Sequence, residues 1–307
     1  MAFTIELVER VLRRLMAAAV AFLLLGSCGG HAAGSSAGGS GPIRVVAAEN
    51  FYGDIASQVG GKHVAITSIL SDPNADPHLY EPGTANAAAV AGADVVIVNG
   101  LGYDAFMGRL LRAAPNGERR VVSVARALHM TGSGVNPHIW YDVPRLHDIA
   151  SAISQGLASV DPAHKTSFRR ALAHFDASLR PLTNAVSRIR SRYGGEAVAY
   201  TEPVPGYLLH AAGLEVRTPD AFAVAIEEGN EPTPQAVAVM DALLENKRVR
   251  VLIYNAQATS PITDGLRRLA RQHGIPIVPV TETLPPHTTF QQWQIDQVRS
   301  LERALAG

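Results

Sequence analysis

The sequence predicts an α/β fold of two Rossmann-like lobes with parallel sheets, joined by one long helix, with a ligand cleft between the lobes. Three observations support this prediction. Short apolar runs alternate with helical patterns in the first half of the chain, and the same alternation returns in the second half. A continuous helical pattern over residues 161–193 separates the two halves. Ligands of such proteins bind beyond the carboxyl ends of the strands and between domains, so function is expected there.

Length and composition agree with two folded lobes. The chain has 307 residues, which suggests about two globular units. A hydrophobic fraction of 47% is ample for buried cores. The 27 basic side chains are balanced by 27 acidic ones, so nucleic acid is not expected as a partner.

The N-terminus predicts export and anchoring. Three arginines precede an apolar run at residues 15–25, followed by Gly26-Ser27-Cys28. This order is typical of a secretory signal peptide, here residues 1–28, and is too short for a lasting membrane span. Leu25 to Cys28 resembles a bacterial lipobox, so Cys28 is the expected lipidation site, and a plain signal peptide is the alternative. Residues 29–41, rich in Gly, Ser and Ala, are expected to form a flexible tether.

The first lobe is expected at residues 42–160. Buried strands are predicted at residues 43–48, 64–70, 95–98 and 121–124. Helices are predicted after residue 50 up to Gly60-Gly61, at residues 85–91 with Thr84 as cap, and at residues 103–113. A Gly-rich loop then leads to Asn136.

The linking helix is expected at residues 161–193, with Asp161 as its cap and a bend at Pro181. The second lobe is expected at residues 194–307. Its strands are predicted at residues 197–200, 249–254 and 277–280. Its helices are predicted at residues 205–212 and 262–273, from Pro234 with Thr233 as cap, and from Thr288 onward.

Two loops of the first lobe each carry a histidine directly after a proline. Residues 71–82 read SDPNADPHLYEP and include His78, and residues 136–142 read NPHIWYD and include His138. Proline restricts its own backbone and that of the residue before it, so each imidazole sits on a stiff loop, which suits a ligand. Turns are also rich in Pro, Asn and Asp, so one such histidine alone could simply occupy a turn. Both loops leave the carboxyl ends of strands, so both histidines are expected on one rim.

Two carboxylates leave strand ends of the second lobe in the same way. Glu202 follows the strand at residues 197–200, and Glu282 follows the strand at residues 277–280. A divalent metal bound by nitrogen and oxygen donors usually takes four or more ligands, so two histidines and two glutamates would complete one site between the lobes. The alternative is that each glutamate caps a helix or is solvated.

The motifs DPHLYEP, NPHIWYD, TEPVPGYLLHAAGLE and EEGNEPTPQ resemble those of the metal-binding solute-binding lipoproteins of zinc and manganese ABC importers. The likeness covers the chain from about residue 43 to the C-terminus, and the two histidine motifs are its most specific parts. The resemblance implies two α/β lobes, one long linking helix and one buried metal. It implies His78 and His138 as ligands from the first lobe, and it places the other two ligands at Glu202 and Glu282.

Glu282 departs from the family pattern, in which the fourth ligand is commonly aspartate. Glutamate is one methylene longer, so its carboxylate must retract or bind differently, and His287 on the same loop is an alternative donor. The zinc-selective relatives often carry a long His-rich acidic loop, where this chain has a short Gly/Ser loop. Two imidazoles and two carboxylates suit both zinc and manganese, so the ligand types do not choose between them.

The sequence thus predicts a monomeric, non-enzymatic lipoprotein on the extracytoplasmic face of the cell membrane. It would capture zinc or manganese and deliver it to an ABC permease in the cytoplasmic membrane. Affinity is expected to fall with pH through the histidine range, because only neutral imidazole coordinates a metal. A helical linker resists bending, so release is expected to use loop movement around His78 or Glu202, with modest lobe rotation.

Two other classes of protein compete with this prediction. A zinc hydrolase would need an open metal position and a general base; there is no H-E-x-x-H motif, and Glu227 or Glu228 would have to serve as the base. A surface adhesin would carry the metal site incidentally. Four histidines within helical patterns are expected to be solvated or hydrogen-bonded, and His129 is a weak candidate ligand. The four are His147, His164, His174 and His210.

Overall fold

The computed structural model describes residues 41–73 and 80–307. Cys28 and His78 lie outside the described residues, as do residues 1–40 of the predicted signal peptide and tether. Within the described part of the chain, no helix is both long enough and apolar enough to cross a membrane.

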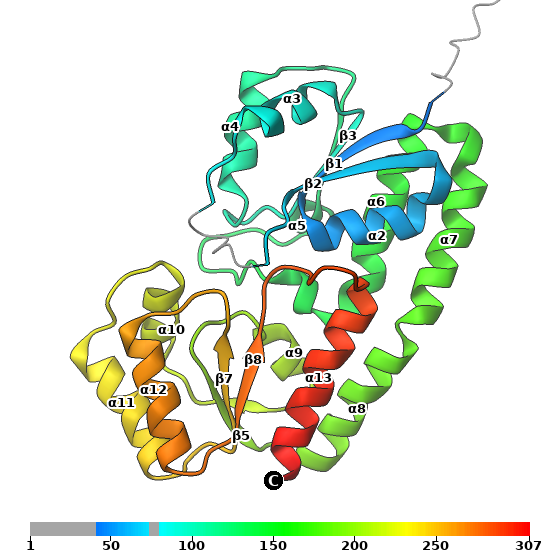
Figure 1. The fold of residues 1–307 in the computed structure, drawn as a ribbon. Coiled ribbons are helices and arrows are strands. Elements are labelled where there is room, and N and C mark those ends of the chain that lie inside the picture. The colour runs from blue at the N-terminus through cyan, green and yellow to red at the C-terminus, as the bar shows by residue number, and fades with distance from the viewer. Residues whose placement is uncertain (1–40, 74–79) are drawn as a thin grey trace, which may run out of the picture. The chain divides into compact units, whose positions relative to one another are not determined.

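Two four-stranded parallel sheets form the framework, which confirms the predicted fold class (Figure 1). The first has the order β2-β1-β3-β4 and the second the order β6-β5-β7-β8, and all neighbouring strands are parallel. The strands of the first sheet are β1 (Ile43–Glu49), β2 (Val64–Leu70), β3 (Val95–Val98) and β4 (Arg120–Ser123). Those of the second are β5 (Ala197–Tyr200), β6 (Glu215–Val216), β7 (Leu252–Asn255) and β8 (Ile277–Val280). The short β6 had no predicted counterpart.

The first sheet is covered on both faces, which explains why its central strands read as continuous apolar runs. Alternate residues of β1 pack on opposite sides: Val45 joins the core formed with α2 and α6, and Val46 joins the core formed with α3 and α4. The helices of this lobe are α2 (Asn50–Gly60), α3 (Thr84–Gly92), α4 (Ala105–Ala113), α5 (Val124–Ala127) and α6 (Leu146–Val160). Helices α5 and α6 had no predicted counterparts. Thr84 lies inside α3, whose N-cap is Gly83, so the predicted cap is wrong.

The predicted single linking helix is divided into α7 (Lys165–Ser178) and α8 (Arg180–Tyr193). Leu179 separates them with φ −78° and ψ −13°, so the backbone stays near helical geometry. Pro181 has no N–H to continue the helical hydrogen bonds, and this explains the break at the predicted place. Asp161 caps neither helix with its side chain, because the 3-10 turn Pro162–His164 comes before α7. That predicted cap is therefore also wrong.

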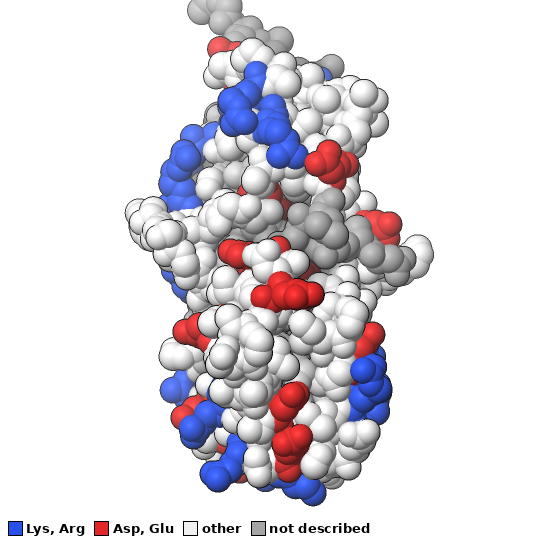
Figure 2. All heavy atoms as spheres, turned by 90° about the vertical axis from the view of Figure 1, so that its left-hand side faces the viewer, with Lys and Arg blue, Asp and Glu red and all other residues white. Residues whose placement is uncertain are grey.

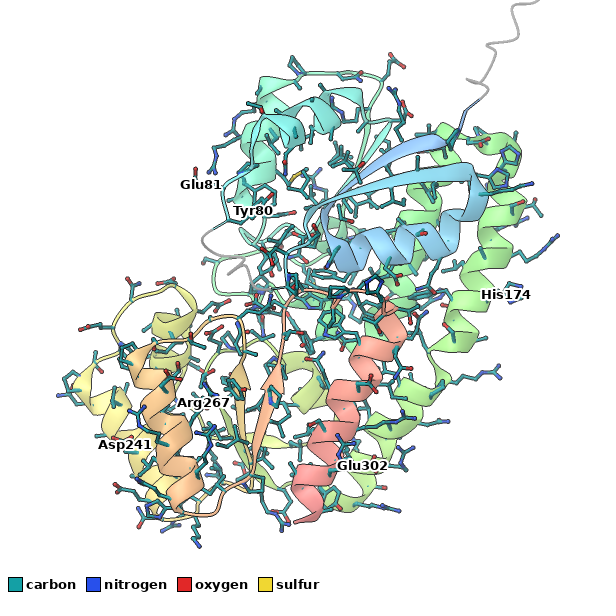
Figure 3. All side chains as sticks on the ribbon, viewed as in Figure 1. Tyr80, Glu81, His174, Asp241, Arg267 and Glu302 are labelled. Carbon is teal, nitrogen blue, oxygen red and sulfur yellow. The ribbon has the colours of Figure 1, made fainter. Side chains whose placement is uncertain are left out.

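The second lobe contains five helices in its described residues, and α10 had no predicted counterpart. They are α9 (Gly206–Ala211), α10 (Asp220–Glu227), α11 (Pro234–Glu245), α12 (Pro261–Gln272) and α13 (Phe290–Ala306). Thr233 caps α11 as predicted, accepting a hydrogen bond from the Ala236 N–H. Helix α13 lies beside α8, and Glu302 on α13 accepts hydrogen bonds from Arg188 on α8 (Figure 3).

One aromatic cluster joins the two lobes. Phe51 on α2 stacks on Trp140 with ring centroids 4.3 Å apart and lies 6.0 Å from Trp293 on α13. These rings are buried in a core that also contains Val198 of β5 and Ile253 of β7. Packed aromatic contacts of this kind make the lobes one continuous hydrophobic body behind the cleft.

Candidate metal centre

His138 is held rigidly at the carboxyl edge of the first sheet. It precedes a 3-10 turn, Ile139–Tyr141, and its side chain is fully buried. The carbonyl of Pro137 accepts a hydrogen bond from Asn99 Nδ2, which anchors this loop to the end of β3. The rings of Tyr103 and Trp140 lie 5.7 and 5.2 Å from the imidazole. The predicted stiff loop is therefore reinforced by packing on two sides.

Asn136 determines which imidazole nitrogen faces the centre. Its Nδ2 donates to the carbonyl of Pro203 over 2.7 Å, so its Oδ1 is turned toward His138. That oxygen lies 2.7 Å from His138 Nδ1 and accepts its N–H. A neutral imidazole that donates from Nδ1 carries its lone pair on Nε2. Nε2 therefore carries the lone pair that a metal would use, and Asn136 gives the imidazole the kind of outer support that ligating histidines commonly have.

Glu282 approaches this nitrogen from the second lobe. Its carboxylate is fully buried, and Oε2 lies 3.2 Å from His138 Nε2. The Tyr103 hydroxyl donates to Oε2 over 3.0 Å, and Asn255 Nδ2 donates to Oε1 over 2.6 Å. Two ligands of a tetrahedral zinc ion stand about 3.4 Å apart, given metal–ligand distances near 2.0–2.1 Å. The His138–Glu282 pair therefore has the spacing that a bound ion requires.

Glu202 is joined to the same group of side chains through Asn255. It is buried, follows β5, and accepts a hydrogen bond of 2.7 Å from Asn255 Nδ2. The two N–H groups of one amide thus serve one carboxylate each, Glu202 and Glu282. Asn255 ends β7, between the strands that precede the two glutamates. It was missed in the sequence, although a polar residue at a strand's carboxyl end is the signal that identified both glutamates.

Gln257 ties the Glu282 loop to the chain that leads toward His78. Its Oε1 accepts hydrogen bonds from the backbone N–H groups of Glu282 and Thr283. Its Nε2 donates to the carbonyl of Pro73, the last described residue before the segment that contains His78. The chain thus enters that segment beside the loop that carries Glu282.

The other predicted donors lie elsewhere. His287 is exposed and has φ 60°, whereas Glu282 is buried against His138, so the geometry favours Glu282 of the two. His129 also has a positive φ, of 56°, and is exposed. Two of the helical histidines behave as expected: His174 points away from α7 into solvent (Figure 3), and His147 Nδ1 lies 2.9 Å from Asp176.

A cleft of about 700 Å³ lies between the lobes and reaches Asn136 and Pro137, the sequence neighbours of His138. Tyr103 and Asn136 line it from the first lobe, and Tyr200, Asp220, Glu227 and Glu228 line it from the second. Glu227 Oε1 lies 3.8 Å from His138 Nδ1. Figure 2 shows acidic side chains gathered at the middle of this face, with Lys and Arg toward its two ends. A cleft lined with carboxylates concentrates cations near the buried donors.

Buried acids extend from the centre into the first lobe. Glu49, at the end of β1, is fully buried, and neither carboxylate oxygen has a hydrogen-bond partner among the described residues. Burial and the nearby Asp104 raise the pKa of Glu49 well above its ordinary value. Burial also raises the pKa of Asp104, although the N–H groups of Asn99 and Gly100 donate to its carboxylate. The first lobe thus keeps buried carboxylates near Tyr103, whose hydroxyl donates to Glu282.

Two lobes of parallel sheet enclosing a buried histidine–carboxylate centre are the architecture of a solute-binding protein. The profile of the family described as "Zinc-uptake complex component A periplasmic" (ZnuA) matches residues 45–304. The chain belongs to this family of metal-binding solute-binding proteins of ABC transporters, as its motifs indicated.

The known relatives include proteins named for zinc and for manganese. The manganese-binding lipoprotein MntA of Bacillus subtilis is 29% identical over 180 residues, which cover 56% of this chain and 58% of the relative. The metal ABC transporter substrate-binding lipoprotein FimA of Streptococcus parasanguinis is 23% identical over 258 residues, or 80% of this chain and 81% of the relative. The periplasmic zinc binding protein TroA of Treponema pallidum has the same fold, with a TM-score of 0.73 at 18% identity over 86% of this chain and 99% of that chain. The chain thus matches only a little over half the length of MntA.

Proposed function

We propose that this protein captures a divalent transition metal, zinc or manganese, outside the cytoplasm and delivers it to an ABC permease. The observation that carries the proposal is the 3.2 Å approach of His138 Nε2 to Glu282 Oε2. Both atoms are acceptors when His138 Nδ1 donates its N–H to Asn136 Oδ1, and both are buried. Buried acceptors at this distance are strongly stabilised by a cation between them.

The proposed ligand set is His78, His138, Glu202 and Glu282. Supporting observations are the shared amide of Asn255, which holds both glutamates, and the bond from Gln257 to Pro73. Four protein ligands would leave no position for a reacting water, so we propose no catalytic activity. The donor set suits zinc and manganese alike, and the natural abundance of each metal would then decide which one is bound.

The proposal also includes a lipid anchor and a division of the chain into three structural segments. Cys28 would carry the lipids that hold the protein, as a monomer, at the extracytoplasmic face of the cell membrane. The segments are a first lobe at residues 42–160, a linking region at 161–193 and a second lobe at 194–307. The aromatic cluster of Phe51, Trp140 and Trp293 supports release by loop movement with modest lobe rotation, because wide opening would separate these rings.

Metal titration of the full chain and two variants tests this function. His138→Ala and Glu282→Ala should each weaken zinc and manganese binding by more than the roughly 100-fold that loss of a supporting residue costs. His287→Ala is the matched control, because it removes an exposed imidazole from the loop that carries Glu282, and it should bind as the unchanged chain does. Unchanged affinity in His138→Ala, or a large loss in His287→Ala, would contradict the proposed ligands.

Metal accumulation in cells tests delivery. A strain lacking this protein should accumulate less zinc or manganese in metal-poor medium, and the unchanged chain should restore accumulation while His138→Ala should not. An adhesin with an incidental site would instead leave accumulation unchanged when the protein is removed.

A further inference from the structure

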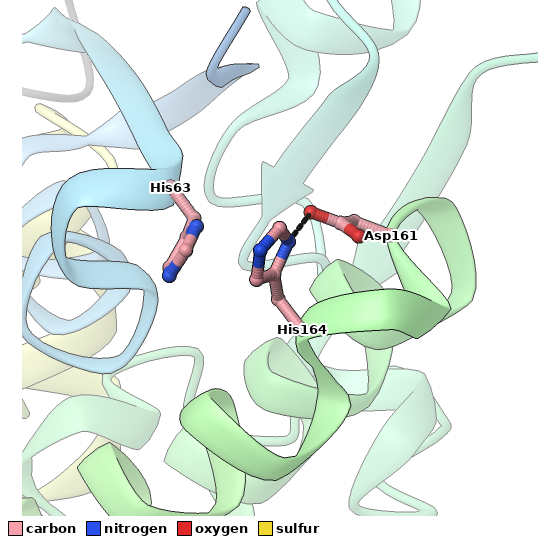
Figure 4. Close-up of side chains that lie close together, drawn as sticks. All are labelled: His63, Asp161 and His164. Carbon is pink, nitrogen blue, oxygen red and sulfur yellow. Dashed lines mark hydrogen bonds and ion pairs between the residues drawn. The ribbon is translucent and has the colours of Figure 1, made fainter. Parts of the chain in front are cut away.

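We propose that His63, Asp161 and His164 form a second site for a divalent transition metal of the zinc class, at the surface of the first lobe (Figure 4). In the described part of the chain, each of these residues offers one donor atom, and the three atoms lie within 4.8 Å of one another. Sequence patterns alone gave none of the three a role as a ligand. The site goes beyond the proposed transport function and does not depend on it.

His164 and Asp161 already form an oriented pair. Asp161 directly precedes the 3-10 turn between α6 and α7 and His164 ends it, and His164 Nδ1 lies 2.6 Å from Asp161 Oδ2. Their backbones are also linked, because the His164 N–H donates to the Asp161 carbonyl. A carboxylate that accepts a hydrogen bond from Nδ1–H fixes the tautomer of the imidazole and leaves the Nε2 lone pair for a metal.

His63 comes from a different part of the chain and lies against this pair. It ends the 3-10 turn between α2 and β2, and its ring centroid is 3.9 Å from that of His164 (Figure 4). The buried ring of Phe168 on α7 meets the His63 ring edge-on at 5.8 Å. Two imidazoles from separate elements are therefore held together by the packing of α2 against α7.

The chemistry of the cluster favours an exchangeable zinc-like ion. The two imidazoles are donors that zinc accepts, at metal–ligand distances of about 2.0–2.1 Å, and Asp161 supports one of them through Nδ1. Two donors of a tetrahedral zinc ion stand about 3.4 Å apart, so the donor atoms of this cluster, which lie within 4.8 Å of one another, must move closer through side-chain rotation. The His164 side chain is 45% exposed, which allows these rotations and leaves water to complete the coordination.

This second site is remote from the His138–Glu282 centre. His63 immediately precedes β2, at the amino edge of the sheet, whereas His138 lies at the carboxyl edge. The seven residues of β2 span about 23 Å between the two edges. Loss of one site should therefore leave the other intact.

Zinc titration of the full chain, purified without a histidine tag, tests the second site. Native mass spectrometry should show a second, weaker zinc ion on the unchanged chain. His63→Ala and His164→Ala should each abolish this ion, or weaken it more than ten-fold, while the tighter ion remains. Asp161→Asn should weaken it about 10–100-fold, the usual effect of losing the partner of a ligating histidine.

A matched control distinguishes binding at this cluster from non-specific zinc binding by other surface histidines. His147 and Asp176 also form a histidine–aspartate pair, at 2.9 Å, so His147→Ala should leave both ions in place. His138→Ala should remove the tight ion and keep the weaker one, which separates this proposal from the transport function. A single zinc ion on the unchanged chain, or a second ion that survives both His63→Ala and His164→Ala, would overturn the second site.

Discussion

Asn136 acts on the candidate metal centre through one hydrogen bond, which its Oδ1 accepts from His138 Nδ1. Its Nδ2 donates to the carbonyl of Pro203 and its Oδ1 accepts from His138 Nδ1, so it joins the second lobe to the proposed ligand of the first. The NPH motif indicated that His138 is a ligand, and the structure adds that the preceding asparagine sets its tautomer. That second role depends on Pro203, which is distant in the sequence, so no local pattern could predict it.

Asn136→Ala should weaken metal binding about 10–100-fold without removing a ligand. The variant frees the imidazole to rotate and to exchange its tautomer, so the lone pair is no longer fixed on Nε2. Competition with a chelating dye measures the change. Asn116→Ala, at an exposed turn, is the control. An affinity equal to that of the unchanged chain would show that the asparagine bond has no part in metal binding.

Glu49 should make the metal-free protein less stable as pH rises. Its pKa is raised by burial, so the folded chain holds a proton that the unfolded chain has already released, between the ordinary pKa and the raised one. Stability therefore falls across that window as pH increases, with a slope of up to ~1.4 kcal/mol per pH unit. Glu49→Gln cannot titrate and should lose this part of the slope.

Urea unfolding of metal-free protein between about pH 5 and pH 8 gives the comparison for Glu49. The difference between the two proteins reports Glu49 together with its coupling to Asp104, whereas Asp54, whose pKa is also raised, is common to both. Glu118→Gln, an exposed substitution, should match the unchanged chain. Parallel stability curves for Glu49→Gln and the unchanged chain would refute the assignment.

At the scale of elements, strands and their edges were the most predictable features. The apolar runs of β1 and β3 are continuous because both sheet faces are covered, and such runs can be recognised in the sequence alone. Helix α6 was missed even though Ile149, Ile153 and Leu157 recur at helical spacing and are buried. The helix caps were less predictable, although Thr84 and Asp161 both have side chains that can cap a helix. The N-cap position of α3 is Gly83, and that of α7 is His164.

Gly156 reveals how closely α6 approaches the first sheet. A β-carbon at this position would overlap Val122 Cγ2 on β4. Gly156→Ala should therefore destabilise the protein by about 1–3 kcal/mol through overpacking, although alanine favours helices. Gly265→Ala in α12 is the control, since its β-carbon would have an ordinary 3.8 Å contact with Arg268.

Thermal or chemical unfolding separates the two glycine variants. Gly265→Ala should gain up to about 1 kcal/mol from helix propensity alone. If Gly156→Ala gains stability by the same amount, α6 does not lie as close to β4 as described.

At the scale of the whole molecule, the centre depends on contacts that only folding brings together. His138 and Glu282 are separated by 144 positions in the sequence and meet within 3.2 Å. Their strand-end positions predicted this meeting, because parallel sheets gather carboxyl ends at one edge. The extra methylene of Glu282 could not be interpreted from sequence, since its fit depends on Tyr103 and Asn255, which hold the carboxylate in place.

Anomalous diffraction from crystals of the full chain grown with zinc, measured on both sides of the zinc edge, tests the metal centre most directly. We expect an anomalous peak that places a zinc ion about 2.0–2.2 Å from His138 Nε2 and from the Glu282 carboxylate. A zinc-loaded crystal with no peak there, in which the two side chains keep their direct contact while zinc occupies His287 or only the surface cluster, would contradict the account.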